Sequence, residues 1–116
     1  MEVTVKRIYE PRGRSDGTCV LVDRLWPRGV SRADLEGVRW MREVAPSDEL
    51  RTWYAHDPNR WAEFARRYRA ELRQAERRRA VAELRTLAQR GRLTLLTATR
   101  DVERSAAEVL RGVLTH

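Results

Sequence analysis

One stretch, Cys19–Ser31, constrains the fold more than any other part of this sequence. Its first part, Cys19–Val22, is apolar and predicts a short buried strand, and the charged pair Asp23–Arg24 follows at the carboxyl end of that strand. A proline and a glycine in Trp26–Gly29 predict a shaped loop, after which Ser31 has the pattern of a helix N-cap. In an open α/β sheet, ligands bind where a strand end leads through a loop into a helix start.

The remaining elements are predicted from hydrophobic periodicity. Two further strands are expected, over Val3–Tyr9, where polar and apolar residues alternate, and over Leu93–Ala98, which is apolar throughout. Helical spacing of apolar residues is found over 61–72, 80–88 and 102–114, and capping patterns predict helix starts at Ser47 and at Asp57. We therefore predict a single α/β domain over residues 1–116, with a short, mostly parallel sheet of about three strands packed by helices. The direction of the first strand and a break between the two middle helices remain open.

Size and composition exclude several classes of protein. The chain has 116 residues, enough for one modest core, and it lacks both a long apolar run for a membrane span and the apolar region of a signal peptide, so we expect a cytoplasmic protein. Cys19 lies within an apolar strand, and neither His56 nor His116 has ligand spacing from it, so we expect no metal site. No glycine-rich phosphate loop is found, and we expect no cofactor. The formal charge of +7 favours anionic partners.

Parallel strands bring their carboxyl ends to one edge of a sheet, which predicts that two charged segments far apart in sequence meet there. These are Asp23–Arg24 and Arg100–Asp101, together with the loop at Arg28. Arginines near a helix start bind carboxylates and phosphates, so a small anionic ligand is the first candidate partner. The predicted ligand-binding residues are Arg24, Arg28, Arg100, Ser31 and Trp26.

Catalysis is left undecided by the sequence. Asp23 and Asp101 are candidates for orienting the arginines or for acting as bases, and His56 is a candidate general acid or base at neutral pH. The alternative for the aspartates is a self-contained network of Arg and Asp side chains that ties two strand ends together. For His56 the alternative is a surface turn before the helix cap at Asp57.

A nucleic-acid-associated protein is the second candidate function. It would present a broad basic face over the helices at Arg66–Arg79, with tryptophans interleaved among arginines for base stacking. The helical spacing of the aromatic residues favours a core role instead. A third candidate, a partner-binding domain, would expose an apolar aromatic patch. The oligomeric state stays open.

Several segments resemble one known family. They are Val5–Pro11, Val20–Ser31, Ala45–Ser47, Leu50–Pro58, Trp61, Phe64, Tyr68 and Leu93–Leu96. Together they cover nearly the whole chain and are similar to the short, YeaO-like branch of the domain-of-unknown-function 488 (DUF488) family. The string Asp-Arg-Leu-Trp-Pro-Arg-Gly at 23–29 is the most specific of these segments. The resemblance implies a small cytoplasmic bacterial α/β domain without an established activity.

The chain departs from the pattern of that family at the start of its last helix. The family carries a His-Asn-His or Asn-Asn type cluster there, whereas this chain has Arg104–Ala106 before Ala107. If that cluster belongs to the site of the family, the exchange weakens acid/base catalysis and leaves anion binding intact.

Overall fold

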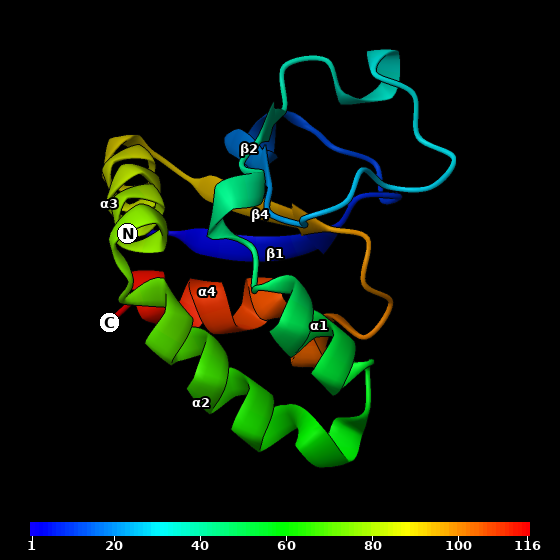
Figure 1. The fold of residues 1–116 in the computed structure, drawn as a ribbon. Helices are drawn as coiled ribbons and strands as arrows, with labels where there is room; N and C mark the ends of the chain where they lie inside the picture. Colours follow the sequence, from blue (N-terminus) through cyan, green and yellow to red (C-terminus); the bar gives the residue numbers. More distant parts are fainter.

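The computed structural model describes residues 1–116 and contains a four-stranded, fully parallel sheet in the order β1-β4-β2-β3 (Figure 1). The strands are β1 Val3–Arg7, β2 Thr18–Leu21, β3 Arg39–Trp40 and β4 Leu93–Thr97. The predicted α/β class is confirmed, with four strands in place of about three. The additional strand is β3, which has only two residues and therefore no periodicity that a sequence could reveal.

The first strand is parallel to its neighbour and does not pair with the second. β1 aligns with β4 from Val3 opposite Leu93 to Arg7 opposite Thr97, so β4 lies between β1 and β2. All four strands consequently point the same way, and their carboxyl ends share one edge of the sheet. We call that edge the carboxyl edge.

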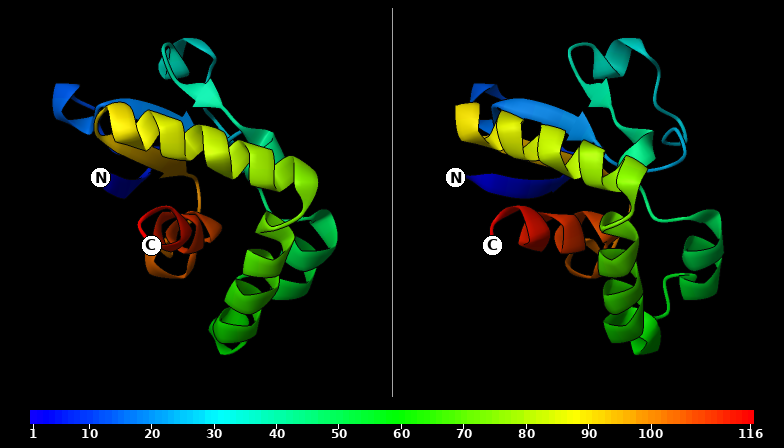
Figure 2. Two further views of the ribbon diagram at one scale, coloured as in Figure 1. Left: turned by 90° about the vertical axis from the view of Figure 1, so that its left-hand side faces the viewer. Right: turned by 60° about the vertical axis from the view of Figure 1, so that its left-hand side comes forward.

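Four α-helices and several short 3-10 segments complete the chain (Figures 1 and 2). The helices are α1 Asp48–Tyr54, α2 Trp61–Leu72, α3 Ala75–Arg90 and α4 Ala106–Leu114. The 3-10 segments are η1 Arg14–Asp16, η2 Ala33–Leu35, η3 Arg42–Val44, η4 Pro58–Arg60 and η5 Val102–Arg104. None of the α-helices has both the length and the hydrophobicity that crossing a membrane requires.

The predicted helix starts are confirmed because they depend on local hydrogen bonds. The Ser47 hydroxyl accepts from the Leu50 N–H at the start of α1, and the Asp57 carboxylate accepts from the Asn59 N–H ahead of Pro58. The two middle helices are separate: α2 ends at Leu72 and α3 starts at Ala75, with Arg73 and Gln74 between them. The break contains neither glycine nor proline, so the sequence gives no clear sign of it.

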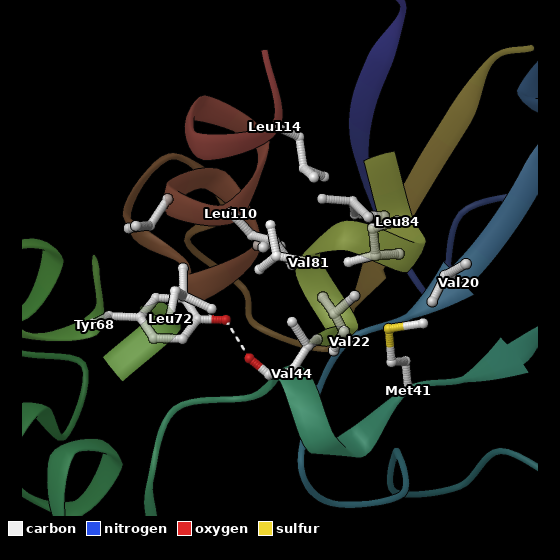
Figure 3. Packing of buried hydrophobic residues seen from close by; sticks show 14 of the residues in the cluster. Val20, Val22, Met41, Val44, Tyr68, Leu72, Val81, Leu84, Leu110 and Leu114 are labelled. Atoms are coloured by element: carbon white, nitrogen blue, oxygen red, sulfur yellow. Dashed lines mark hydrogen bonds between the residues drawn. The ribbon is translucent and has the colours of Figure 1, made fainter. Parts of the chain in front are cut away.

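The main core lies on the face of the sheet that α3 and α4 cover (Figure 3). Valines and leucines of the strands pack there against the apolar stripes of the helices, as the helical spacing predicts. Tyr68 of α2 is almost fully buried in this core, and its hydroxyl donates to the Val44 carbonyl oxygen at 2.6 Å. The aromatic rings of Tyr54 and Phe64 stack with centroids 4.1 Å apart, so these aromatic residues build the core.

The opposite face of the sheet is covered by the segment between β2 and β3. Leu21 and Leu96 of the strands pack with Ile8 and Leu35 in a second, smaller cluster, with Trp26 and Trp40 at its margin. This segment, the β1–β2 connection and the β4–α4 connection all leave the sheet at the carboxyl edge (Figure 1).

Candidate functional site

Asp23 joins three strands at the carboxyl edge. Its carboxylate accepts the Thr97 hydroxyl at 2.8 Å through Oδ1 and the Ala98 N–H at 2.7 Å through Oδ2. Its own carbonyl oxygen accepts the indole N–H of Trp40, also at 2.7 Å. The ends of β2, β3 and β4 are therefore held together by one residue, and Asp23 meets the end of β4 at Thr97 and Ala98.

The surroundings of Asp23 also change its acidity. Burial raises the pKa of Asp23, while the hydrogen bonds from Ala98 and Thr97 and the positive field of His56 act in the opposite direction. Thr97 is itself buried, and its Oγ1 also accepts the N–H of Thr99 at 3.1 Å. Asp23 thus has threonine and backbone partners, whereas the sequence suggested arginine partners.

Arg24 turns toward α1. Its Nε lies 2.9 Å from Oδ1 of Asp48, the first residue of that helix. This ion pair is half-exposed and gives Arg24 a carboxylate partner that is 24 positions away in the sequence. Of the predicted arginines at this edge, Arg24 is therefore the one whose charge is already compensated within the chain.

Arg28 lies against the end of β1. The Tyr9 hydroxyl donates to the Arg28 carbonyl oxygen at 3.0 Å, and the guanidinium of Arg7 lies 5.0 Å from the centroid of the Tyr9 ring. Arg28 is exposed and forms no ion pair. Through Tyr9, the loop at Arg28 and the last residue of β1 belong to the same part of the carboxyl edge.

Arg7 is a residue that the sequence analysis missed. It is opposite Thr97 in the β1–β4 register, and its Nε is buried without any hydrogen-bond partner. A buried donor without a partner is costly, so Arg7 is the most unusual polar group at the edge. A signal was present in the sequence: Arg7 follows Val3 and Val5 at a spacing of two, which puts a charge on the apolar side of the strand.

Arg100 follows β4 and is exposed, without an ion pair. Its neighbour Asp101 pairs instead with Arg104 at 3.1 Å. The backbone N–H groups of Arg100 and Asp101 make no hydrogen bond to the backbone of the chain. This connection therefore offers a free guanidinium and two free backbone donors at the carboxyl edge.

Ser31 and Trp26 are engaged inside their own loop. Ser31 and Asp34 exchange hydrogen bonds of 2.8 and 3.1 Å between backbone and side chain, which is the predicted capping pattern. The Trp26 indole donates to the Val30 carbonyl oxygen at 2.7 Å, and its ring packs edge-on against Trp40. Both residues shape the loop that carries Arg28.

His56 is exposed in the turn after α1 and has a left-handed backbone, with φ of 57°. Its ring lies 6.3 Å from that of Tyr54.

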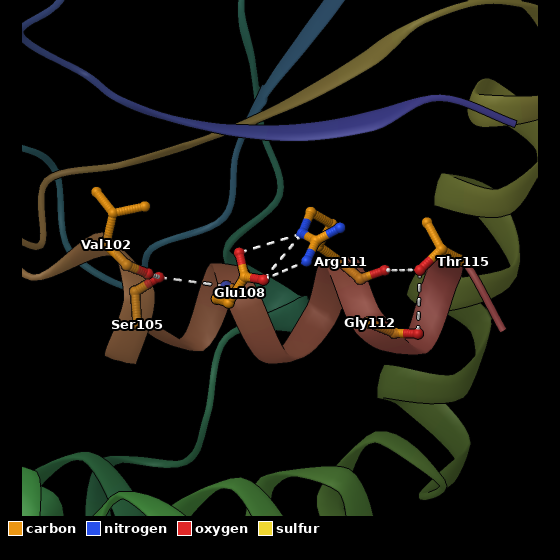
Figure 4. A network of polar contacts seen from close by, with 6 residues as sticks. All are labelled: Val102, Ser105, Glu108, Arg111, Gly112 and Thr115. Carbon is orange, nitrogen blue, oxygen red and sulfur yellow. Dashed lines mark hydrogen bonds and ion pairs between the residues drawn. The ribbon is translucent and has the colours of Figure 1, made fainter.

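The start of α4 is held by structural contacts. Ser105 caps the helix by accepting the Glu108 N–H at 3.2 Å and donates to the Val102 carbonyl oxygen (Figure 4). The Tyr54 hydroxyl donates to the Arg104 carbonyl oxygen at 2.8 Å, which ties α1 to this segment. The hydroxyl of Ser105 is thus committed to the helix cap.

Comparison with known proteins identifies the family of this chain. A model described as the inactive DUF488-N3 subclade matches residues 2–116. The chain belongs to the DUF488 family. This DUF488 chain is 49% identical over 112 residues to the uncharacterized protein Rv3073c of Mycobacterium tuberculosis, covering 97% of the chain and 92% of that relative. It is 39% identical over 110 residues to the uncharacterized protein YeaO of Escherichia coli, covering 95% of the chain and 94% of YeaO.

The predicted resemblance to the YeaO-like branch is therefore confirmed. Another relative, the uncharacterized protein Mb3100c of Mycobacterium bovis, has the same 49% identity over 112 residues. None of the solved structures matches this DUF488 chain.

Proposed function

We propose that this DUF488 chain binds a small anionic molecule, bearing a phosphate or a carboxylate, at the carboxyl edge of its sheet. The observation that carries the proposal is the buried Nε of Arg7, which has no hydrogen-bond partner in the chain. A guanidinium donates several hydrogen bonds in a planar fork, which matches the oxygens of a phosphate or a carboxylate. An oxyanion beside Arg7 would supply the acceptor that this donor lacks.

Neighbouring groups support the same ligand. Arg28 and Arg100 carry positive charges that no carboxylate of the chain compensates, and the backbone donors of Arg100 and Asp101 are free. Free backbone N–H groups in a turn bind anions. Arg24 contributes less to the proposed site, because Asp48 already holds its guanidinium.

Binding without catalysis is the form of the proposal that the observations favour. The family model that matches this chain is described as an inactive subclade, and Arg104–Ala106 replace the histidine and asparagine cluster that the resemblance to the family implies. Asp23, the most buried acid at the edge, has both carboxylate oxygens occupied by Thr97 and Ala98. We therefore infer that Asp23 maintains the shape of the site and that the arginines hold the ligand.

The nucleic-acid alternative is supported less well. Two arginines of the predicted basic face, Arg66 and Arg67, are bound by Glu63, and they lower the pKa of that carboxyl to about 2. A third, Arg77, donates from Nε to the Ala45 carbonyl oxygen at 2.8 Å. The exposed large hydrophobic residues are Met1, Tyr9 and Leu25, of which one is aromatic, so the partner-binding alternative lacks its aromatic patch.

Thermal unfolding in the presence of small anions tests the proposal. Phosphate, pyrophosphate and citrate would be screened against the parent chain, against Arg7→Met and against Arg28→Ala. Arg14→Ala is the matched control, because Arg14 is also an exposed arginine without an ion pair but lies in η1, ahead of β2 at the other end of the sheet. At a hundredfold excess over Kd, a ligand adds about 2.7 kcal/mol to the stability, which raises Tm by several degrees.

The parent and Arg14→Ala should respond alike, and the two other variants should lose most of the rise in Tm. Equal responses of all four proteins, or no response to any anion, would overturn the proposal. Tight binding of an oligonucleotide that weakens steeply with salt, together with indifference to small anions, would favour the nucleic-acid alternative.

A further inference from the structure

A hollow of about 260 Å³ lies between α2, α3 and α4, away from the residues of the carboxyl edge. Its apolar lining consists of Leu72 of α2, Val81 of α3 and Val113 near the end of α4. Because α4 starts at the carboxyl edge and ends beside the N-terminus of the chain, the hollow belongs to the other end of that helix (Figures 1 and 2). It is therefore separate from the site proposed above.

Four arginines surround this apolar lining. They are Arg69, Arg73, Arg78 and Arg85. Helical spacing explains their convergence, since residues three, four or seven positions apart lie on one face of a helix. Arg69 belongs to α2, Arg73 directly follows its last residue, and α3 contributes the other two, on either side of Val81.

None of these four guanidiniums forms an ion pair. The acid that lies between Arg69 and Arg73 in the sequence, Glu71, is occupied elsewhere: its two carboxylate oxygens accept the Ser47 N–H and hydroxyl at 2.8 and 2.5 Å. Only Arg85 has a partner, the Val113 carbonyl oxygen at 3.1 Å from its Nη2. The hollow thus concentrates positive charge that the chain does not neutralise.

The base of the hollow is continuous with the main core. Leu72 and Val81 are both core residues, and their side chains lie near Leu110 of α4 (Figure 3). An apolar group in the hollow would extend this packing and remove apolar surface from water, which favours the complex. The hollow therefore combines an apolar surface with a cationic rim.

We propose that this hollow binds a small amphiphilic anion, a carboxylate or phosphate monoester on a short hydrocarbon chain, as a free molecule in solution. The anionic head pairs with the guanidiniums and relieves the repulsion among them, while the hydrocarbon chain covers Leu72, Val81 and Val113. Pockets for drug-sized ligands measure about 300–1,000 Å³, so the size of the hollow selects a ligand at or below the small end of that range.

The arrangement fits a compact amphiphile better than a polymeric anion. A nucleic-acid backbone needs cations spread along a groove, whereas these four converge around one apolar hollow. The neighbouring arginines that would extend the charge along α2, Arg66 and Arg67, are held by Glu63.

The experiment uses probes that separate the head from the tail. Octanoate carries both, acetate carries only the head, octanol carries only the tail, and octylamine reverses the charge. Isothermal titration of the full chain measures the binding of each probe. Vesicles of anionic phospholipid form a further arm, which distinguishes a free amphiphile from a lipid headgroup in a membrane.

Two adjacent arginines of α3 provide matched variants. Arg78 lines the hollow, whereas Arg79 is equally exposed and does not line it. We expect Arg78→Gln to weaken octanoate binding about tenfold and Arg73→Gln to act similarly, because each removes a charge-assisted hydrogen bond. Arg79→Gln should bind like the parent, and so should Arg100→Gln at the carboxyl edge.

Saturable binding of octanoate, with acetate, octanol and octylamine each at least tenfold weaker, supports the proposal. Acetate binding that is as tight as octanoate binding and is weakened by Arg78→Gln would overturn it, as would equal weakening of octanoate binding by Arg78→Gln and Arg79→Gln. Association with anionic vesicles but not with monomeric octanoate would also overturn it.

Discussion

The Asp23 carboxylate and the Thr97 hydroxyl lie 2.8 Å apart, although 74 positions separate the two residues in the sequence. Together with the bond from Ala98, this contact closes the carboxyl edge between β2 and β4. Asp23→Ala removes both acceptors and leaves the Thr97 hydroxyl and the Ala98 N–H without their partner. We expect a loss of about 1–3 kcal/mol in the free energy of unfolding, measured by urea denaturation.

Asp101→Ala serves as the control for that measurement. Asp101 is an exposed aspartate of the same edge, and its ion pair with Arg104 spans a single turn. We expect a change of no more than about 0.5 kcal/mol. If the two variants lose equal stability, Asp23 does not hold the edge together as described.

The acidity of Asp23 predicts a pH dependence. Burial raises its pKa above the ordinary value of 3.8, so the folded chain keeps this proton to a higher pH than the unfolded chain does. Protonated Asp23 therefore adds to the free energy of unfolding in full below pH 3.8, and this contribution is lost as the pH rises through the raised pKa of the folded chain. Asp23→Asn has no such proton.

We expect the unfolding free energy of the parent, minus that of Asp23→Asn, to decrease between about pH 3 and pH 7. The subtraction removes the opposite trend from acids such as Glu63, whose pKa is lowered to about 2 by Arg66 and Arg67 in both proteins. A difference that stays constant or increases with pH would show that Asp23 is not destabilised as an anion.

Gly17 and Gly37 provide a matched pair for testing the backbone that leads into the sheet. Both have a left-handed φ, of 66° and 81°, but a Cβ at Gly17 would lie 2.3 Å from the Arg92 carbonyl oxygen, whereas one at Gly37 would meet open space. Gly37→Ala should lose about 1–2 kcal/mol from backbone strain alone. Gly17→Ala should lose a further 1–3 kcal/mol or so, because the carbonyl that it displaces also accepts the Thr18 N–H.

Chemical denaturation of the two glycine variants checks this ordering. If Gly17→Ala is no less stable than Gly37→Ala, the close approach of Gly17 to Arg92 does not exist in solution.

Local interactions made much of the fold predictable. The caps at Ser47 and Asp57 and the apolar stripe of α2 depend only on residues close together in the sequence. They occur where the sequence predicts them. The pairing of β1 with β4 could not be predicted in the same way, because it depends on contacts between residues about 90 positions apart, such as Thr4 and Thr94. The two-residue strand β3 carries no periodic signal.

At the carboxyl edge, the position of Asp23 was predictable, whereas the contacts of the arginines were not. Parallel strands alone predict that Asp23 meets the end of β4, and it does so at Ala98. The ion pair between Arg24 and Asp48 depends on where α1 packs, which no local pattern specifies. The role of Arg7 was not predicted, because a charged residue is common in a strand whose polar and apolar residues alternate. Its spacing of two from Val5 nevertheless places its charge on the apolar side of the strand.

Titration of the ¹⁵N-labelled chain with inorganic phosphate, followed by NMR, shows whether the carboxyl edge binds an anion. We expect saturable shifts at the Arg7 Nε–H and at the backbone N–H groups of Arg100 and Asp101, and loss of the two backbone shifts in Arg7→Met. Shifts that never saturate, or that are confined to the arginines around the hollow between α2, α3 and α4, would contradict the proposal that the carboxyl edge is an anion site.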